Sequence, residues 1–393
     1  MPPSLFDGSL APDLWHYLCA ASDHGRPIVM YGMGNGADKI LAVLDRYGIS
    51  VAAFFASDGF VRGHSFHGKT VLSYSAMRET YAADDPIVLL SFASSRPDVL
   101  ALIDRVAAEC ELYAPDVPVA GATLFDAAFV ESHRAELDAA RALLADDASR
   151  QVFDGVIRYK LTGRVDLLRA TESAPDEAFS AILPTATFRR TADLGAYTGD
   201  TVRELRTYAP ALREIIAMEP DRRNRGKLDV YAAALAEAGE DCRVHVVPAG
   251  AWSEDTVLTF HDSGNRNACL AGETVAGAEK GQTPPTTAEN PYFGKTAEVP
   301  VRSLDTVAAE VWGVDDRIDY IKYDVEGAEA EALRGSRSLI ARYAPALLVS
   351  AYHRSEDIFA LPLLVHELNP RYRLYLRRMA GVPAWDLNLY GVM

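Results

Sequence analysis

The chain lacks several features that would assign it to other classes of protein. Its 393 residues contain no run of about 18 apolar residues, the length needed to cross a bilayer. The N-terminal segment has neither the basic start nor the unbroken apolar block of a signal peptide. We therefore expect a cytoplasmic protein without a membrane span.

Cysteine and basic residues are also scarce. The four cysteines are scattered and form no C-x-x-C pair, which disfavours a zinc site or a disulfide framework and agrees with a reducing compartment. Lysine and arginine number 39 against 55 acidic residues, a formal charge of -16. Since nucleic-acid binding depends on basic side chains that neutralise phosphates, we expect no nucleic-acid partner. The basic stretch ELNPRYRLYLRR, residues 367–378, is interpreted as a strand with an exposed charged side.

Apolar residues are plentiful, at 49% of a chain long enough for two domains. Near the N-terminus, PIVMYG, a glycine-rich helical stretch and VAAFFASD follow the order strand, helix, strand, which is typical of a parallel sheet. We predict a Rossmann-like domain over residues 1–125, closed by the apolar piece VPVAGAT at residues 117–123.

The first turn of this domain resembles a dinucleotide fingerprint. Gly32, Gly34 and Ala37 follow the pattern G-x-G-x-x-G/A, and Asp58 ends the second strand. Such a turn also needs glycines for tight packing when no nucleotide binds. A nucleotide or nucleotide-sugar ligand of this domain therefore stays one alternative.

The remaining chain divides into two parts. Residues 126–185 have a helical pattern and are predicted to connect the domains, with a helix cap at Asp146 or Asp147 and a helix end at Gly163. Residues 186–393 alternate strands and helices and close with two alternating strands, which predicts an α/β doubly wound sheet with a C-terminal antiparallel hairpin. An insertion at 261–300 is predicted to be a lid whose flanks pair as strands.

A second glycine loop, DLGAYTGDT, differs from the first in its charge. Asp193 and Asp200 flank it and would repel a phosphate, so it suits a cationic ligand such as S-adenosyl-L-methionine. Glu219 ends the next strand, where a carboxylate can accept both ribose hydroxyls. S-adenosyl-L-methionine is a methyl donor, and the residues predicted to bind it are Asp193, Gly195, Ala196, Tyr197, Gly199, Thr201, Glu219, Ala251, Trp252 and Asp324.

Structural alternatives exist for several of these positions. Asp193 could be a turn former, and Glu219 could pair with Arg222 or Arg223. Trp252 either stacks on the adenine or fills the core. Asp200 or Thr201 is expected to cap the helix that follows the loop.

The stretch IDYIKYDVEGAE supplies carboxylates at a later strand end, where ligands of open α/β sheets bind. Together with His353 after the fifth strand, Asp324 and Glu326 are the predicted catalytic residues. A hydroxyl acceptor benefits from a general base, and either His353 or Glu326 is expected to serve. Asp324 would lie near the methionine part of the donor or orient the substrate.

Other roles remain open for these residues. His353 could bond backbone and Glu326 could cap the next helix. The carboxylates permit a divalent metal but do not require one, so none is predicted. Glu329 and Glu331 are expected to be solvated.

From about residue 188 onwards, DLGAYTGDT, AMEPD, IKYDVEGAEAEALRG and the later YH occur in the order found in FkbM-family methyltransferases, which this part of the chain resembles. The resemblance implies a class I methyltransferase fold, S-adenosyl-L-methionine as donor, and methyl transfer to a hydroxyl of a sugar, glycan or secondary metabolite. The alternatives are an NAD- or nucleotide-sugar-linked oxidoreductase or epimerase acting through the first domain, and a non-catalytic nucleotide-binding scaffold. The acceptor, O- versus N-methylation and the oligomeric state, a homo-oligomer included, are left open.

Overall fold

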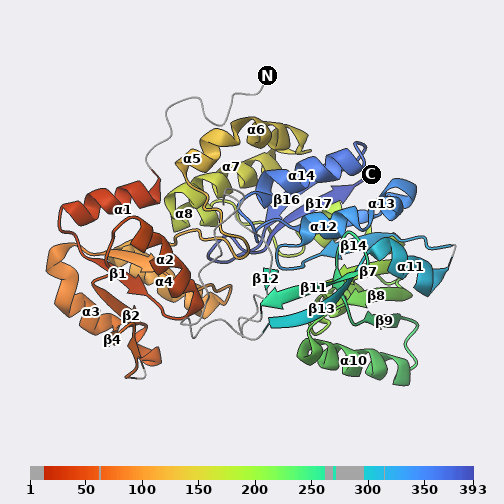
Figure 1. Ribbon diagram of the computed structural model, residues 1–393, viewed down its shortest axis with the longest axis horizontal. Helices are drawn as coiled ribbons and strands as arrows, with labels where there is room; N and C mark the ends of the chain where they lie inside the picture. Colours follow the sequence, from red (N-terminus) through yellow and green to blue (C-terminus); the bar gives the residue numbers. More distant parts are fainter. Residues whose placement is uncertain (1–12, 62, 262–268, 271–295, 314) are drawn as a thin grey trace, which may run out of the picture.

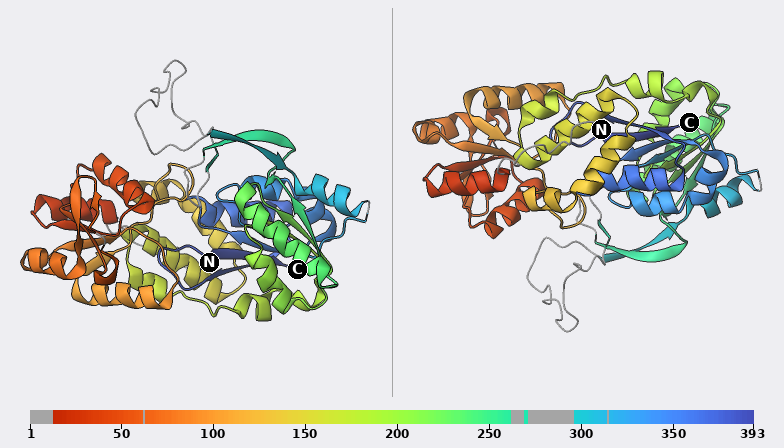
Figure 2. Two further views of the ribbon diagram at one scale, coloured as in Figure 1. Left: turned by 90° about the horizontal axis from the view of Figure 1, so that it is seen from below. Right: turned by 90° about the horizontal axis from the view of Figure 1, so that it is seen from above.

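The computed structural model describes residues 13–61, 63–261, 269–270, 296–313 and 315–393. Two α/β halves lie end to end along the long axis of the molecule, with a group of helices between them (Figures 1 and 2). Within the described ranges, every helix is too short or too polar to cross a membrane.

The first half is built on a six-stranded sheet with the order β3-β4-β2-β1-β5-β6. All neighbours are parallel except β3 and β4. The central strands are short and entirely buried, as expected for a parallel sheet covered on both faces. The elements are α1 (Leu14–Asp23), β1 (Ile28–Tyr31), α2 (Asn35–Arg46), β2 (Ala53–Ala56), η1 (Asp58–Phe60), β3 (Ser65–Phe66), β4 (Lys69–Ser73), α3 (Tyr74–Tyr81), η2 (Ala82–Asp84), β5 (Ile87–Leu90), α4 (Pro97–Glu109) and β6 (Glu111–Tyr113).

The prediction that residues 117–123 close this sheet is wrong. The last strand is β6, and residues 117–123 form a loop. Pro118 has no N–H to donate to a strand neighbour, and Gly121 has a φ of 78° that a regular strand does not adopt. The loop runs to the second half, where Ala120 N donates to the carbonyl of His353 at 2.8 Å.

The connecting segment is helical, as predicted. Asp146 accepts a hydrogen bond from Ser149 N and caps α7, and Gly163 ends that helix with a φ of 66°. The helix packs on the second half through Ser149 Oγ, which accepts from Leu376 N at 2.9 Å. The elements are α5 (Ala127–Ser132), α6 (Arg134–Leu143), α7 (Asp147–Thr162), α8 (Val165–Arg169), η3 (Ala178–Ile182) and η4 (Thr185–Thr187).

The second half contains a seven-stranded sheet with the order β16-β17-β15-β14-β7-β8-β9. Five strands are parallel, and β17 is antiparallel to both of its neighbours, which confirms the predicted doubly wound sheet and terminal hairpin. The elements are β7 (Arg190–Leu194), α9 (Asp200–Tyr208), β8 (Glu214–Met218), α10 (Arg222–Glu237), β9 (Arg243–Val247), α11 (Leu304–Trp312), β14 (Tyr320–Tyr323), α12 (Glu329–Arg334), α13 (Arg337–Tyr343), β15 (Ala346–Ser350), α14 (Asp357–Leu368), β16 (Arg373–Arg378) and β17 (Leu387–Val392).

Side chains of this sheet alternate between two covered faces. Ile321 and Leu347 point into a cluster with α11, α13 and α14, whereas Tyr320 and Leu348 point towards α9. The first cluster also contains Val29 and Val88 from the other sheet, so buried apolar contacts run from one half to the other.

The prediction of an exposed charged side on the basic C-terminal strand is wrong for its last two residues. Arg377 is only 4% exposed and pairs with Asp146 and Glu177. Arg378 is fully buried and donates to the carbonyls of Leu168 and Gly381. Helices α7 and α8 cover this strand, and the guanidinium groups of Arg377 and Arg378 bind the helical connector to the sheet.

The flanks of the insertion pair as predicted. β11 (Thr256–His261) runs antiparallel to β13 (Thr296–Arg302), in a four-stranded sheet with β10 (Gly250–Ala251) and β12 (Cys269–Leu270). The centre of the predicted lid, residues 262–268 and 271–295, lies outside the described residues. The lid therefore stays a prediction.

Candidate active site

Four predicted site residues meet at one edge of the second sheet. Asp193 is in β7, Glu219 follows β8, Asp324 follows β14 and His353 lies beyond the end of β15. These strands are parallel neighbours, so their carboxyl ends lie side by side. The predicted donor loop and the predicted catalytic residues are therefore on the same side of the molecule.

The glycine loop after β7 is held tightly between two strands. Gly195 N and Ala196 N both donate to the carbonyl of Met218 at 3.0 Å. Gly195 has a φ of 86°, and a Cβ atom there would overlap the carbonyl oxygen of Asp324. Tyr197 and Gly199 also have positive φ values, 46° and 79°. The loop thus needs its glycine at 195 for conformation and for contact with the β14 strand end.

Glu219 lies directly beneath this loop. Its side chain is 6% exposed and accepts from Tyr197 N at 2.9 Å and from Asp221 N at 2.7 Å. The carboxylate therefore accepts hydrogen bonds from backbone N–H groups, and the expected ion pair with Arg222 or Arg223 does not form among the described residues. Burial raises the pKa of Glu219 to about 7.

The side chain of Asp193 contacts two other side chains, so its role is more than that of a turn former. One oxygen is 3.4 Å from Lys322 Nζ and the other accepts from the hydroxyl of Thr201. The expectation that Asp200 or Thr201 caps α9 is wrong, because Gly199 occupies the cap position without a side-chain bond. A cavity of about 280 Å³ borders Asp193, Thr201, Lys322 and Asp324.

Ala251 is in β10 of the four-stranded sheet, and Trp252 follows it directly. Ala251 is buried, and Trp252 N donates to the carbonyl of Arg302 at 2.9 Å. The indole is partly exposed. Its stacking on an adenine ring stays a prediction.

His353 is the centre of the predicted catalytic cluster. The imidazole is 1% exposed, and its Nε2 lies 3.7 Å from Asp324 Oδ1 and 3.5 Å from Glu326 Oε2. Its Nδ1 lies 2.9 Å from Glu329 Oε1. The structure therefore brings together all three predicted catalytic residues, and it adds Glu329.

The charges of this cluster are strongly coupled. Burial opposes the protonated imidazole, but attraction by Glu329, Asp324 and Glu326 raises the pKa of His353 to about 10. Burial likewise opposes ionisation of Asp324, but Lys322 and His353 lower the pKa of this carboxyl. Burial raises the pKa of Glu326. With the site in this form, His353 is a cation at neutral pH rather than a group that titrates there.

A family model, the methyltransferase FkbM domain, matches residues 193–380. These residues belong to the FkbM methyltransferase family. The match begins at Asp193 and includes the predicted donor loop, Glu219 and the whole cluster around His353. The first half of the chain lies outside it.

One solved structure shares the fold of nearly the whole chain. The crystal structure of methyltransferase FkbM from Methylobacillus flagellatus KT covers 97% of this chain and 94% of its own, with 20% identity and a TM-score of 0.71. At that identity the likeness shows a shared fold, and it extends beyond the FkbM domain into the first half. A putative O-methyltransferase from Klebsiella pneumoniae covers 65% of this chain and 94% of its own, with 13% identity and a TM-score of only 0.32. The search of curated proteins gave no match.

The sequence-based expectation that Glu329 is solvated is wrong. This residue of the FkbM domain is 1% exposed, and its Oε1 accepts from Val325 N at 2.9 Å and Gly327 N at 3.4 Å. A glutamate at the first position of a helix, just after a strand end, is the signal that could have indicated this role. Glu331 fits the surface expectation better, since it is 31% exposed and pairs with Arg334.

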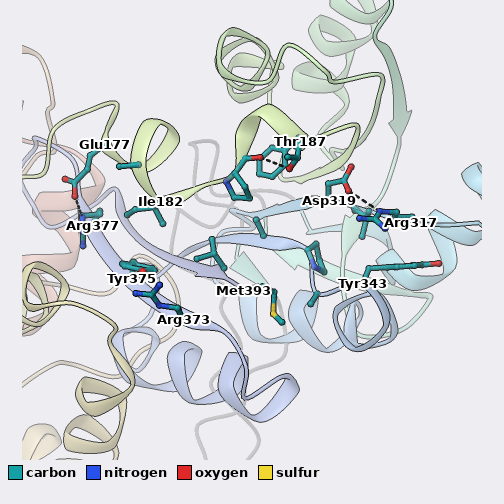
Figure 3. Close-up of a pocket in the computed structure, with 18 of the residues that line it drawn as sticks. Glu177, Ile182, Thr187, Arg317, Asp319, Tyr343, Arg373, Tyr375, Arg377 and Met393 are labelled. Carbon is teal, nitrogen blue, oxygen red and sulfur yellow. Dashed lines mark hydrogen bonds and ion pairs between the residues drawn. The ribbon is translucent and has the colours of Figure 1, made fainter.

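A larger cavity of about 530 Å³ lies at the opposite edge of the FkbM domain, where the parallel strands begin (Figure 3). Several of its charged groups already have partners, because Arg377 pairs with Glu177 and Arg317 with Asp319. The predicted site residues do not line it. The smaller cavity beside Asp193 and Asp324 is therefore the one relevant to the candidate site.

Proposed function

We propose that the chain is an S-adenosyl-L-methionine-dependent O-methyltransferase that acts on a hydroxyl of a sugar, glycan or secondary metabolite. The observation that carries the proposal is the direct contact between the donor loop and the catalytic cluster in an FkbM domain. Gly195 of the loop packs against the carbonyl of Asp324, whose side chain lies beside His353. A donor on the loop would thus present its methyl group to the cluster.

The donor side fits a cationic nucleoside. Glu219 keeps free acceptor capacity for ribose hydroxyls, since each oxygen receives only one hydrogen bond from the chain. The adjoining cavity is lined by one ammonium group, that of Lys322, and by four carboxyl groups, those of Asp193, Glu204, Asp324 and Asp386. This excess of acidic groups favours a sulfonium and an ammonium group.

Glu326 is the proposed general base. Its side chain is 41% exposed, whereas that of His353 is 1% exposed, so only the former is open to an incoming acceptor. The hydroxyl proton would pass to Glu326 as the oxygen bonds to the methyl carbon and the carbon–sulfur bond breaks, leaving S-adenosylhomocysteine. His353 would position Glu326 and Asp324. Because displacement needs the reacting atoms in line, this positioning supplies much of the rate.

The first half gives less support to a dinucleotide enzyme. Both oxygens of Asp58 are engaged by Ser75, at 3.0 Å from its N and 2.8 Å from its Oγ. A Cβ atom on Gly36 would overlap the carbonyl of Ser91, so this turn needs glycine for packing. The oxidoreductase alternative would be favoured if NAD protected the first half and S-adenosylhomocysteine had no effect.

Calorimetry with S-adenosylhomocysteine tests the proposal directly. We expect saturable binding to the wild-type chain, and a loss of affinity in the Glu219→Ala variant. Transfer of a labelled methyl group to a panel of sugars and glycans then identifies the acceptor. Absence of binding at millimolar ligand would exclude the proposed donor, and donor binding without turnover on any acceptor would favour the scaffold alternative.

Donor affinity is expected to depend on pH through Glu219. Its pKa of about 7 means that the carboxylate becomes protonated as the pH falls below neutral. The neutral acid loses acceptor capacity for the ribose, so the affinity for S-adenosylhomocysteine should fall by roughly tenfold between pH 8 and pH 6. Calorimetry across this range measures the change, and the Glu219→Gln variant, which does not titrate there, serves as the control. A pH profile of the same slope in both proteins would contradict the assignment.

A further inference from the structure

Two buried polar atoms beside His353 have no hydrogen-bond partner among the described residues: His353 Nδ1 and Glu329 Oε2. Nδ1 is 2.9 Å from Glu329 Oε1, but the pair lies outside hydrogen-bond geometry. Both side chains are 1% exposed. An unpaired buried polar atom is unfavourable for folding, so the arrangement favours a further group that binds both residues.

Asp324 completes a set of three ligands. One atom each from Asp324, Glu329 and His353 can be chosen so that all lie within 4.8 Å of one another. Ligand atoms that share one ion at bond lengths of about 2.0–2.2 Å are at most about 4.4 Å apart. Side-chain shifts of a few tenths of an ångström would therefore close the set around an ion.

We propose that Asp324, Glu329 and His353 bind a divalent transition-metal cation of the Mn²⁺ type. The donor set of one imidazole nitrogen and two carboxylate oxygens suits such an ion. Binding of the cation would displace the proton of His353, because an imidazole must be neutral to be a ligand, and the cation would balance the negative charges of Asp324 and Glu329. Three protein ligands leave coordination positions open for water or for an acceptor oxygen.

A role for this cation in methyl transfer rests on the proposed function, although cation binding does not. An acceptor hydroxyl bound to the ion would lose its proton more readily. Glu326 lies 3.5 Å from His353 Nε2 and is partly exposed, so it stands at the open side of the cluster. The proton would pass from the hydroxyl to that carboxylate.

The test is titration of the chelator-treated full chain with Mn²⁺, with the free ion measured by electron paramagnetic resonance. We expect one saturable Mn²⁺ site per chain. The Glu329→Gln and Asp324→Asn variants each replace a ligand, so they should lose more than the roughly 10–100-fold in affinity that removal of an outer-shell partner causes. Glu331→Gln is the matched control, because it removes a charge from the same helix at a residue that pairs with Arg334.

Thermal unfolding with and without Mn²⁺ provides a second measurement. Glu329 also accepts two backbone N–H groups, so its substitution can unfold the chain; Asp324 is 31% exposed, and its variant tests the same site with less risk. Mn²⁺ should raise the melting temperature of the wild type and the Glu331→Gln variant but not that of Asp324→Asn. The proposal would be overturned if all added Mn²⁺ stayed free in a titration of the wild type up to millimolar concentration. Equal Mn²⁺ affinity of Asp324→Asn and Glu331→Gln would overturn it too. Donor calorimetry in the presence of chelator tests the methyltransferase separately.

Discussion

The Glu326→Gln variant is expected to transfer methyl groups about 10²–10⁴-fold more slowly than the wild type, the usual contribution of a general base. Glutamine keeps the size of the side chain and loses the proton acceptor. Among the described residues, the Glu326 side chain makes no contact with the predicted donor loop. The affinity for S-adenosylhomocysteine should therefore not change. Single-turnover transfer of a labelled methyl group and donor calorimetry measure the two quantities.

The Glu331→Gln variant controls for loss of a negative charge nearby. Glu331 is on α12 and pairs with Arg334 at the surface, so its variant should keep the wild-type rate. If Glu326→Gln retained more than a tenth of the wild-type rate, Glu326 would not be the base. An equal loss in both variants would point to a general electrostatic effect instead.

Replacement of Gly195 by alanine is expected to have the largest effect on the donor site. The backbone there has a φ of 86°, which costs a non-glycine residue about 1–3 kcal/mol. The added methyl would also overlap the carbonyl of Asp324, so the loop and the β14 strand end must separate. We expect loss of measurable S-adenosylhomocysteine binding and a lower melting temperature, by calorimetry and thermal unfolding.

Gly239→Ala is the matched control for this substitution. Gly239 has a similar φ of 69°, but a Cβ atom there meets no heavy atom within 4 Å. It therefore carries the backbone cost without the overlap, and the difference between the two variants isolates the contact with Asp324. Equal stability of both variants, with donor binding intact, would show that this close contact is not required.

Strand ends were predictable because they follow local patterns. Short apolar runs bounded by glycine, proline or acidic residues placed Asp193, Glu219, Asp324 and His353 at or just beyond the ends of four parallel strands. Parallel order then required these ends to share one edge, which the sheet confirms. The caps at Asp146 and Gly163 were predictable for the same reason, since each depends on a few neighbouring residues.

Burial of charged side chains was not predictable in this way. Glu329, Arg377 and Arg378 look like surface residues because their sequence neighbours do not reveal which other element covers them. Glu329 is buried because it accepts backbone N–H groups of its own loop and contacts His353, which lies beyond the end of β15. The two arginines are buried because the connector helices pack over the last strands.

The sequence by itself determined the order of strands and helices, the position of the glycine loop after β7 and the residues at the strand ends, because hydrophobic periodicity and turn chemistry act over short distances. Only the tertiary structure decided that residues 117–123 form a loop against His353, that Glu329 lies in contact with His353, and that polar atoms there lack partners among the described residues. Each of these depends on contacts between segments far apart in the chain, and local patterns carry no information about such contacts.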